Sequence, residues 1–416
     1  MPSVLPRERR AAVVFILITV ALDVLSLGII IPVLPRLVEG FLGGDTEQAA
    51  RIYGGFGTVW ALAQFLCSPI LGSLSDRFGR RKVVLLSNFG LGLDYVLMAL
   101  APTLGWLFAG RIISGITSAS FSTAGAYIAD VTPVEKRAAG FGLIGAAFGV
   151  GFVLGPALGG VLGDISPRLP FWAAAVLTLV NATYGLFILP ESLPPERRRP
   201  FSWRRANPVG ALRLLSRHPE LAGLASVNFI YLLAHQVLPS VFVLYAGYRY
   251  EWGPGEVGLV LAGIGGLSVI VQGGIVRRAV PRFGERRTLL TGLLCGAAGF
   301  AIYGLAPTPG ILLMGMPVFS LMGLFGPSAQ GLMTRRVEPG EQGQLQGANS
   351  SLMGIAGMIG PGIFSLTFAA FIGRHRDWHL PGAPFLLAGA MMLVAAVVAW
   401  RVTMNSRHYS DIITTS

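Results

Sequence analysis

The feature that most constrains this chain is a series of long apolar runs separated by short polar breaks. Each run has about 19 residues or more, enough to cross a hydrocarbon core of about 30 Å as a helix that rises about 1.5 Å per residue. A segment inside lipid must satisfy its own backbone hydrogen bonds. We therefore predict an all-α integral membrane protein with twelve transmembrane helices. The predicted spans are 11–35, 50–74, 83–101, 104–128, 138–163, 171–190, 220–245, 255–279, 288–306, 309–333, 344–371 and 382–402.

The composition also indicates lipid as the solvent of this chain. It is 53% hydrophobic and only 12% charged, whereas a soluble domain carries about 25% charged residues. The 56 glycines and 27 prolines would break helices in water, but membrane helices use glycine for close packing and tolerate proline kinks. Cys67 and Cys295 both lie inside apolar runs and predict neither a metal site nor a disulfide framework.

The positive charges predict the orientation of the chain. With a cytoplasmic N-terminus, 25 of the 32 lysines and arginines fall in inner segments, six fall in outer loops, and Arg111 lies inside a span. Positive residues concentrate in the cytoplasmic loops of membrane proteins. We therefore predict a multi-pass protein of the plasma (inner) membrane with both termini in the cytoplasm. The net charge of +12 then reflects topology and contact with membrane lipids, and it indicates no nucleic-acid partner.

The chain divides into two halves that partly repeat each other. Arg-Phe-Gly occurs at 77–79 and 282–284, and Gly-Pro occurs at 155–156 and 360–361, each pair being separated by 205 residues. Such matches argue for duplication of a six-helix unit, which is how many secondary transporters build a midplane site that faces either side in turn. A twelve-helix protein with chance matches is the alternative. We predict an N-terminal bundle at 1–190, a cytoplasmic linker at 191–218 and a C-terminal bundle at 219–416.

Three charged side chains lie deep inside predicted spans, well away from the span ends, where each costs about 2.5–3.5 kcal/mol on insertion scales. Asp23 lies about 19 Å and Asp94 about 18 Å above the inner boundary, so both are near the midplane. Burial disfavours the charged form of a carboxylate, and we predict that both acids exchange protons or bind substrate. Structural carboxylates paired with a hydroxyl or amide are the alternative. Arg111 cannot lose its proton and could pair with either acid, unless it snorkels to the outer headgroups.

Neutral polar side chains also lie inside the spans. His235 changes charge near neutral pH and could carry a proton, or it could simply be packed and hydrogen-bonded across helices. Amide side chains could line a cavity and bind substrate, although hydrogen bonding between helices is an equal alternative for each of them. The candidate substrate-binding residues are Gln64, Asn228, Gln236, Gln272, Gln330 and Asn349.

The polar loop at 72–82, between the second and third spans, is predicted to act as a gate. Asp76 could cap the start of a neighbouring helix, and Arg80 could pair with Asp130 at the end of the fourth span. A basic loop that only sets topology is the alternative. The predicted gating residues are Gly72, Asp76, Arg77, Gly79, Arg80, Arg81 and Asp130.

The fifth span carries a small residue at every fourth position, which makes one helix face smooth enough for another helix to approach closely. We predict a packing seam that also limits proton leak, with a kink at its proline. Packing without any further function is the alternative. The helix-packing residues are Gly151, Gly155, Pro156 and Gly159.

Taken together, these motifs resemble those of a known family. The loop at 72–82 resembles the signature loop of the major facilitator superfamily, and 151–160 looks like the antiporter motif of its drug:proton antiporters. Segments that resemble tetracycline efflux proteins lie at 20–23, 93–95, 125–130, 284–287 and 342–347. The resemblance implies the major facilitator fold, with proton-coupling roles for Asp23 and Asp94. The histidine and aspartate of the tetracycline exporters' eighth and ninth spans fall on Ser268 and Gly296 here, so those two roles do not carry over.

We therefore predict a secondary active transporter that exports a small drug-like compound, tetracycline-like or multidrug, in exchange for protons by alternating access. Its partners would be the small-molecule substrate, protons and lipids, and it would function as a monomer. A symporter or facilitator that imports a nutrient or metabolite is the alternative, because sequence encodes direction poorly. The chain lacks the motifs of an ATP motor, a zinc peptidase and a serine hydrolase, so we expect neither enzymatic activity nor a cofactor.

Overall fold

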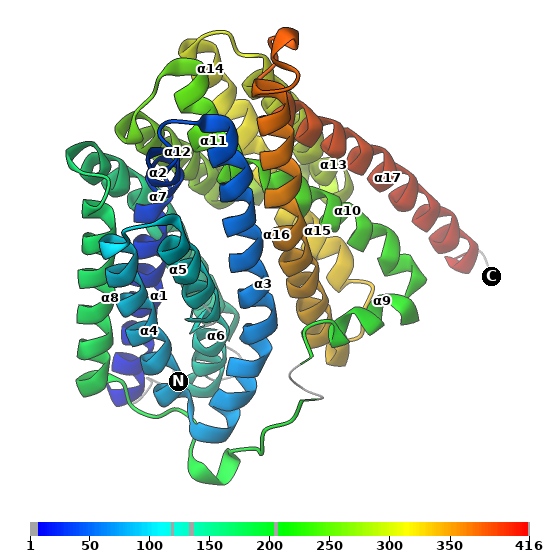
Figure 1. Cartoon of the computed structure of the whole chain (residues 1–416). Helices are drawn as coiled ribbons and strands as arrows, with labels where there is room; N and C mark the ends of the chain where they lie inside the picture. Colours follow the sequence, from blue (N-terminus) through cyan, green and yellow to red (C-terminus); the bar gives the residue numbers. More distant parts are fainter. Residues whose placement is uncertain (1–6, 118–119, 133–136, 204–206, 415–416) are drawn as a thin grey trace. The chain divides into compact units, whose positions relative to one another are not determined.

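The computed structural model describes residues 7–117, 120–132, 137–203 and 207–414, which form helices and loops without a β-strand (Figure 1). In the first half the α-helices are α1 (Arg7–Ile30), α2 (Leu34–Phe41), α3 (Thr46–Phe78), α4 (Arg80–Leu100), α5 (Leu104–Thr117), α6 (Ser120–Val131), α7 (Arg137–Ile165) and α8 (Leu169–Ile188). In the second half they are α9 (Arg213–Arg217), α10 (Pro219–His235), α11 (Val237–Tyr250), α12 (Pro254–Ile270), α13 (Val276–Leu305), α14 (Pro309–Ser320), α15 (Phe325–Thr334), α16 (Gln342–Ile372) and α17 (Ala383–Thr414).

Ten helical stretches of the described chain are long and apolar enough to cross a membrane. One of them, Pro254–Leu305, covers two predicted spans, and Gly284 with a φ of 79° interrupts the helix between them. The predicted span 104–128 corresponds to α5 and α6, and residues 118–119 between these helices lie outside the described chain. The all-α membrane fold is thus confirmed, whereas the count of twelve helices stays a prediction.

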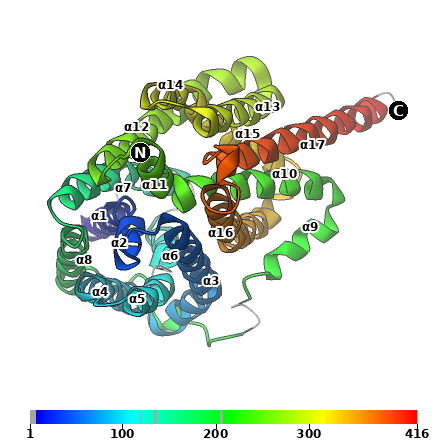
Figure 2. The same ribbon diagram turned by 45° about the horizontal axis from the view of Figure 1, so that its top comes forward.

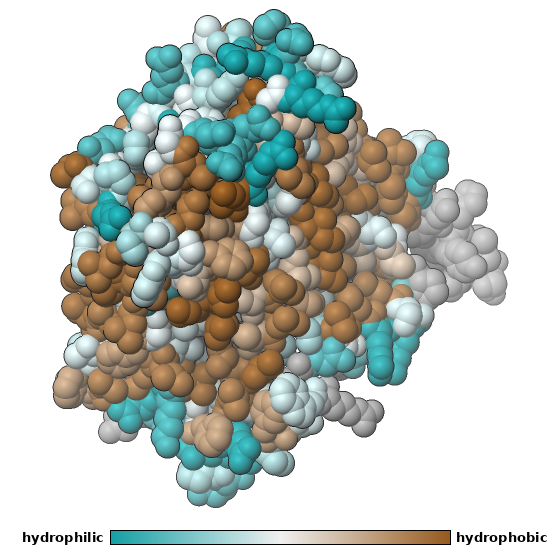
Figure 3. Space-filling view, in the orientation of Figure 1, coloured by the Kyte–Doolittle hydropathy of each residue, from teal (hydrophilic) through white to brown (hydrophobic). Residues whose placement is uncertain are grey.

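Large apolar side chains are exposed along the helices. Leu86 is 73% exposed, Met314 79% and Phe187 84%. On the face shown in Figure 3, apolar side chains cover the middle of the helices and hydrophilic ones gather at the helix ends. Exposed apolar surface on this scale is unusual for a soluble monomer and marks contact with lipid or a partner. Because the exposed residues lie on helices of membrane-spanning length, lipid is the natural solvent for them.

The chain forms two compact units. Unit 1 comprises Met1–Gly44, Val59–Pro208 and Trp252–Ala262, and unit 2 comprises Asp45–Thr58, Val209–Glu251 and Gly263–Ser416. The start of α3 therefore groups with the second half, and the start of α12 groups with the first. The boundaries of the two bundles and of the linker stay a prediction.

The two units repeat the same helix pairing. In unit 1, α1 packs along α7, and α4 packs along α8 (Figure 2). In unit 2, α10 and α11 pack along α16, and α13 packs along α17. The pair α1 and α7 (first and fifth predicted spans) thus corresponds to α10–α11 and α16 (seventh and eleventh). The pair α4 and α8 (third and sixth) corresponds to α13 and α17 (ninth and twelfth). This agreement supports the duplication inferred from the repeated motifs.

Candidate functional site

A charged centre is buried in unit 1, where Asp23 of α1, Asp94 of α4 and Arg111 of α5 converge. The two aspartates are each 2% exposed, and Arg111 is 9% exposed. All three act electrostatically on the hydroxyl group of Tyr95, which is itself fully buried. The structure therefore brings together the three ionisable residues that the sequence places inside the spans of the first half. Tyr95 was not predicted to be part of this site, although it directly follows Asp94.

Gly110 allows α5 to approach α4 at the level of this centre. A Cβ atom at Gly110 would lie 3.0 Å from Asp94 Oδ1 and 2.6 Å from Met98 Cγ. The next residue, Arg111, lies over the indole ring of Trp60, with its Cζ atom 5.2 Å from the ring centroid. The face of an aromatic ring stabilises a cation at this distance. The Gly-Arg pair thus holds a permanent positive charge beside the carboxylate of α4.

The carboxylate group of Asp94 lies beside a cation but makes no hydrogen bond within the described chain. Neither of its carboxylate oxygens accepts a hydrogen bond from a described residue, and Arg111 is the charged group that acts on it. Burial disfavours the charged form of such a group, whereas the nearby cation favours it. Protonation of Asp94 would therefore break no hydrogen bond to a described residue.

The loop at 72–82 forms a charged cluster at the end of unit 1 where the linker begins. Arg80 Nη1 lies 2.6 Å from Asp76 Oδ1, and Arg80 Nε lies 3.2 Å from Asp130 Oδ2. The predicted pair between Arg80 and Asp130 is therefore present. The predicted cap is different, because Asp76 pairs with Arg80 and another acid caps α4. The role of the cluster as a gate stays a prediction.

Glu191 caps the start of α4. Its Oε1 accepts hydrogen bonds from the backbone N–H groups of Arg80 at 2.8 Å and Leu193 at 3.1 Å. Gly79 makes this possible because its φ of 100° favours glycine and because a Cβ atom there would collide with the Glu191 carboxylate. Sequence analysis did not single out Glu191, although an acid directly after a span and before a basic run was a usable signal.

The remaining gating candidates surround this cap. Gly72 accepts a hydrogen bond from Ser75 Oγ at 2.7 Å, Arg77 lies over the ring of Phe78, and Arg81 Nη2 donates to the Leu186 carbonyl at 2.6 Å. A cavity of about 670 Å³ lies beside the cluster. It is lined by Asp76, Arg80, Asp130, Leu193, Glu196, Arg197, Arg198 and Arg199. The loop and the start of the linker therefore form one connected polar structure.

Replacing Glu191 with alanine is expected to loosen the start of α4 by about 1 kcal/mol, the usual contribution of a helix cap. Hydrogen exchange at the amides of Arg80 and Arg81 should then become about fivefold faster, because exchange reports local opening. Glu196→Ala, at an exposed position of the same linker, is the matched control and should leave exchange unchanged. Equal exchange rates in the Glu191 variant and the parent protein would contradict the cap.

Three of the six candidate substrate-binding amides form a chain in unit 2. Asn228 Nδ2 of α10 donates to Asn349 Oδ1 of α16 at 3.2 Å, and Asn349 Nδ2 donates to Gln330 Oε1 of α15, also at 3.2 Å. Beside this chain Tyr231 stacks on Phe325, with ring centroids 4.0 Å apart. The structure thus joins three helices of unit 2 through a polar and aromatic cluster.

The other polar candidates lie elsewhere. Gln64 lies in unit 1, Gln272 is exposed in the π-helical segment Val271–Ile275 after α12, and Gln236 packs against Gly360 of α16. His235, predicted inside a continuous span, is instead the last residue of α10, and Gln236 separates it from α11. Its side chain is exposed.

The space beside Gly296, where the resemblance would place an aspartate, is occupied by Met322. A Cβ atom at Gly296 would lie 2.9 Å from Met322 Cγ, so the Met322 side chain fills the space of a larger residue. At the other departure, Ser268 Oγ donates to the carbonyl group of Ile264 within its own helix. Neither position of unit 2 therefore offers a charged group.

The fifth span, α7, packs closely against α1. A Cβ atom at Gly155 would lie 2.6 Å from Gly28 Cα, and one at Gly151 would lie 2.8 Å from the Leu25 backbone nitrogen. Gly159 meets the backbone of Ile29 in the same way. Pro156 lies inside α7, which continues as one helix from Arg137 to Ile165. The proposed limit on proton leak stays a prediction.

Comparison with known proteins identifies similar chains over nearly the full length. The family model described as Major Facilitator Superfamily matches residues 16–361 and 224–414. The class C tetracycline resistance protein of Escherichia coli is 40% identical over 92% of this chain and 95% of its own length. The class G tetracycline resistance protein of Vibrio anguillarum is 37% identical over 89% of this chain and 93% of its own.

Solved structures show the same fold. The human organic anion transporter MFSD10 (TETRAN) superposes with a TM-score of 0.70 at 25% identity, covering 95% of this chain and 100% of that one. A bacterial homolog of the human lysosomal transporter Spinster gives a TM-score of 0.75 at 16% identity, covering 96% of this chain and 97% of that one.

Proposed function

Since this chain belongs to the major facilitator superfamily, we propose that it is a secondary transporter that exports a small drug-like compound in exchange for protons. The identity of 40% to a tetracycline resistance protein supports export of a drug. The observation that carries proton coupling is the buried centre of Asp23, Asp94 and Arg111. A charged group embedded in the membrane is costly to retain unless it has a function.

The proposed cycle uses the opposed effects on Asp94. When Asp94 is charged, Arg111 stabilises it across the contact between α4 and α5. A proton that arrives from outside neutralises the carboxylate, weakens its attraction to Arg111 and favours the other arrangement of the helices. Release of the proton inside restores the pair, so the proton gradient resets the carrier after each release of substrate.

Substrate recognition is assigned to unit 2. The Asn228–Asn349–Gln330 chain offers amide donors and acceptors, and Tyr231 with Phe325 offers a stacked aromatic surface. This combination suits a partly apolar compound with several hydroxyl or carbonyl groups. Tetracycline is the first compound to assay, because curated relatives carry its name. Ser268 and Gly296 stand where the tetracycline exporters have a histidine and an aspartate. The proposal therefore also includes a substrate other than tetracycline.

The proposal includes an inner-membrane location with both termini in the cytoplasm, supported by the distribution of positive residues. It also includes a monomeric carrier without enzymatic activity. A cysteine placed near the C-terminus, for example Ser410→Cys, should react with a membrane-impermeant thiol reagent only after cells are opened.

Transport into inverted vesicles tests the function. Vesicles that contain the protein should accumulate tetracycline or another exported compound when their lumen is acidified, because export from the cell becomes uptake in this orientation. Collapse of the pH gradient with an ionophore should abolish the accumulation. Accumulation that survives the collapse would contradict proton coupling, and uptake of a nutrient by whole cells would favour an importer.

A further inference from the structure

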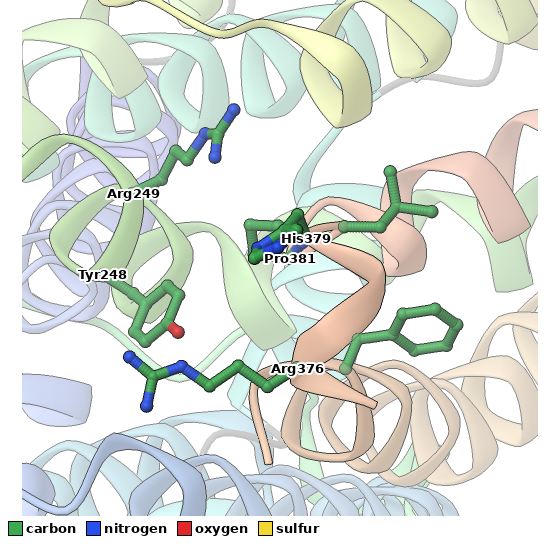
Figure 4. Close-up of a pocket in the computed structure, with 7 residues that line it drawn as sticks. Tyr248, Arg249, Arg376, His379 and Pro381 are labelled. Atoms are coloured by element: carbon green, nitrogen blue, oxygen red, sulfur yellow. The ribbon is translucent and has the colours of Figure 1, made fainter. Parts of the chain in front are cut away.

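A cationic pocket lies in unit 2, at the end of α11 and beside the loop that joins α16 to α17. Its lining residues are Tyr248, Arg249, Phe371, Arg376, His379, Leu380 and Pro381 (Figure 4). We call it the loop pocket. No acidic residue lines it, and its volume is about 220 Å³. Pockets for drug-sized ligands measure about 300–1,000 Å³, so this pocket suits a smaller group than the transported compound.

The loop pocket has a preformed frame. The backbone N–H of His375 donates to the Ala370 carbonyl at 2.8 Å, and that of His379 donates to the Arg376 carbonyl at 3.0 Å. Trp378 packs edge-on against Phe371, with ring centroids 5.6 Å apart. These contacts fix the loop on the end of α16, so Arg376 starts from a defined position. Figure 4 shows the side chain of Arg376 extending past Tyr248, whereas that of Arg249 points away from Arg376, to the other side of the pocket.

The two arginines of the loop pocket are not neutralised within the described chain. No carboxylate of a described residue lies within salt-bridge distance of Arg249 or Arg376, and Arg249 has instead a hydrogen bond with the Tyr250 side chain. Both guanidinium groups are permanently charged. In the proposed topology this is the outer side, where lysine and arginine are generally scarce. The preference of positive residues for the cytoplasmic side therefore does not account for Arg249 and Arg376.

Exposed aromatic residues beside the loop pocket favour a position at the level of lipid headgroups. Trp378 is 68% exposed and Tyr248 is 39% exposed, and such aromatic residues collect at membrane interfaces. Phe371, Leu380 and Pro381 give the pocket an apolar side next to its arginines. A guanidinium group matches a phosphate in shape and charge, and can donate two parallel hydrogen bonds to it. We propose that the loop pocket binds a phosphate ester, and that its source is an anionic phospholipid of the outer leaflet.

The test measures binding of phosphatidylglycerol to the purified full-length protein by native mass spectrometry and by the rise in thermal midpoint. Phosphatidylcholine serves as the zwitterionic comparison. Phosphatidylglycerol should stabilise the protein more, and Arg376→Gln and Arg249→Gln should each weaken its binding about tenfold, the effect of losing a charged hydrogen bond. Arg374→Gln is the matched control, because it removes an exposed arginine of the same loop that does not line the pocket.

Four outcomes would overturn the assignment, wholly or in part. Equal binding of the two lipids, or no effect of either pocket variant, would remove the site. An equal loss in Arg374→Gln would indicate diffuse attraction to a basic surface. Glycerol 1-phosphate, a soluble phosphate ester, is tested beside the two lipids to identify the source of the phosphate. If it binds as tightly and depends on the same two arginines, the phosphate site stands and the lipid source is wrong.

Discussion

Replacing either buried aspartate with asparagine is expected to abolish transport driven by a pH gradient while the protein remains folded. Asparagine has nearly the same volume as aspartic acid, but its amide cannot exchange a proton. Asp23 and Asp94 are each 2% exposed, and substitution by a neutral group removes a buried charge rather than adding one. Uptake into inverted vesicles should fall to the background of vesicles without the protein, with unchanged yield and gel-filtration profile.

Counterflow separates a proton role from a structural one. Vesicles loaded with unlabelled substrate exchange it for labelled substrate without a pH gradient, and the Asp94→Asn variant should retain this exchange. A purely structural carboxylate would lose exchange and gradient-driven uptake together. Asp377→Asn, at an exposed loop position, controls for the loss of one negative charge. Normal gradient-driven export by Asp23→Asn would remove Asp23 from the mechanism.

The grouping of the charged centre could be predicted because depth in a membrane follows from counting residues along a helix. Asp23 and Asp94 lie on different helices, yet each is about 12 or 13 residues from the basic inner boundary. Hydropathy and the cost of burying charge then leave few alternatives. The contact of Arg111 with Trp60 was not predictable in this way, since it depends on which face of α3 turns toward α5.

The cap of α4 escaped prediction for a different reason. Glu191 and Arg80 are 111 residues apart, and no local spacing links them. Two interruptions of predicted spans were missed as well, at Gln236 between α10 and α11 and at the π-helical segment Val271–Ile275. Hydropathy remains high across both. Packing decides where the backbone departs from an α-helix. The local signs were Pro239, which cannot donate a hydrogen bond to the His235 carbonyl, and a pair of glycines at 273–274.

Gly155→Ala is expected to destabilise unit 1 by about 1–3 kcal/mol, the range for overpacking a tight interior. The added Cβ atom would lie 2.6 Å from Gly28 Cα and 3.0 Å from the Leu25 carbonyl oxygen. These are backbone atoms of α1 that cannot rotate away, so α1 and α7 must separate along their seam. The midpoint of thermal unfolding in detergent should fall, and transport should fall with it because both helices belong to the unit that holds Asp23.

Gly145→Ala distinguishes this steric effect from the general effect of alanine in a helix. Gly145 lies on the same helix, and no atom would come within 4 Å of a Cβ there. Alanine should be neutral at this position or stabilise the protein by up to about 1 kcal/mol, because it is the better helix former. Equal stability of the two variants would mean that α1 and α7 do not need the glycine seam. A loss of stability in both Gly155→Ala and Gly28→Ala, but not in Gly145→Ala, would establish that the backbones of α1 and α7 are in contact.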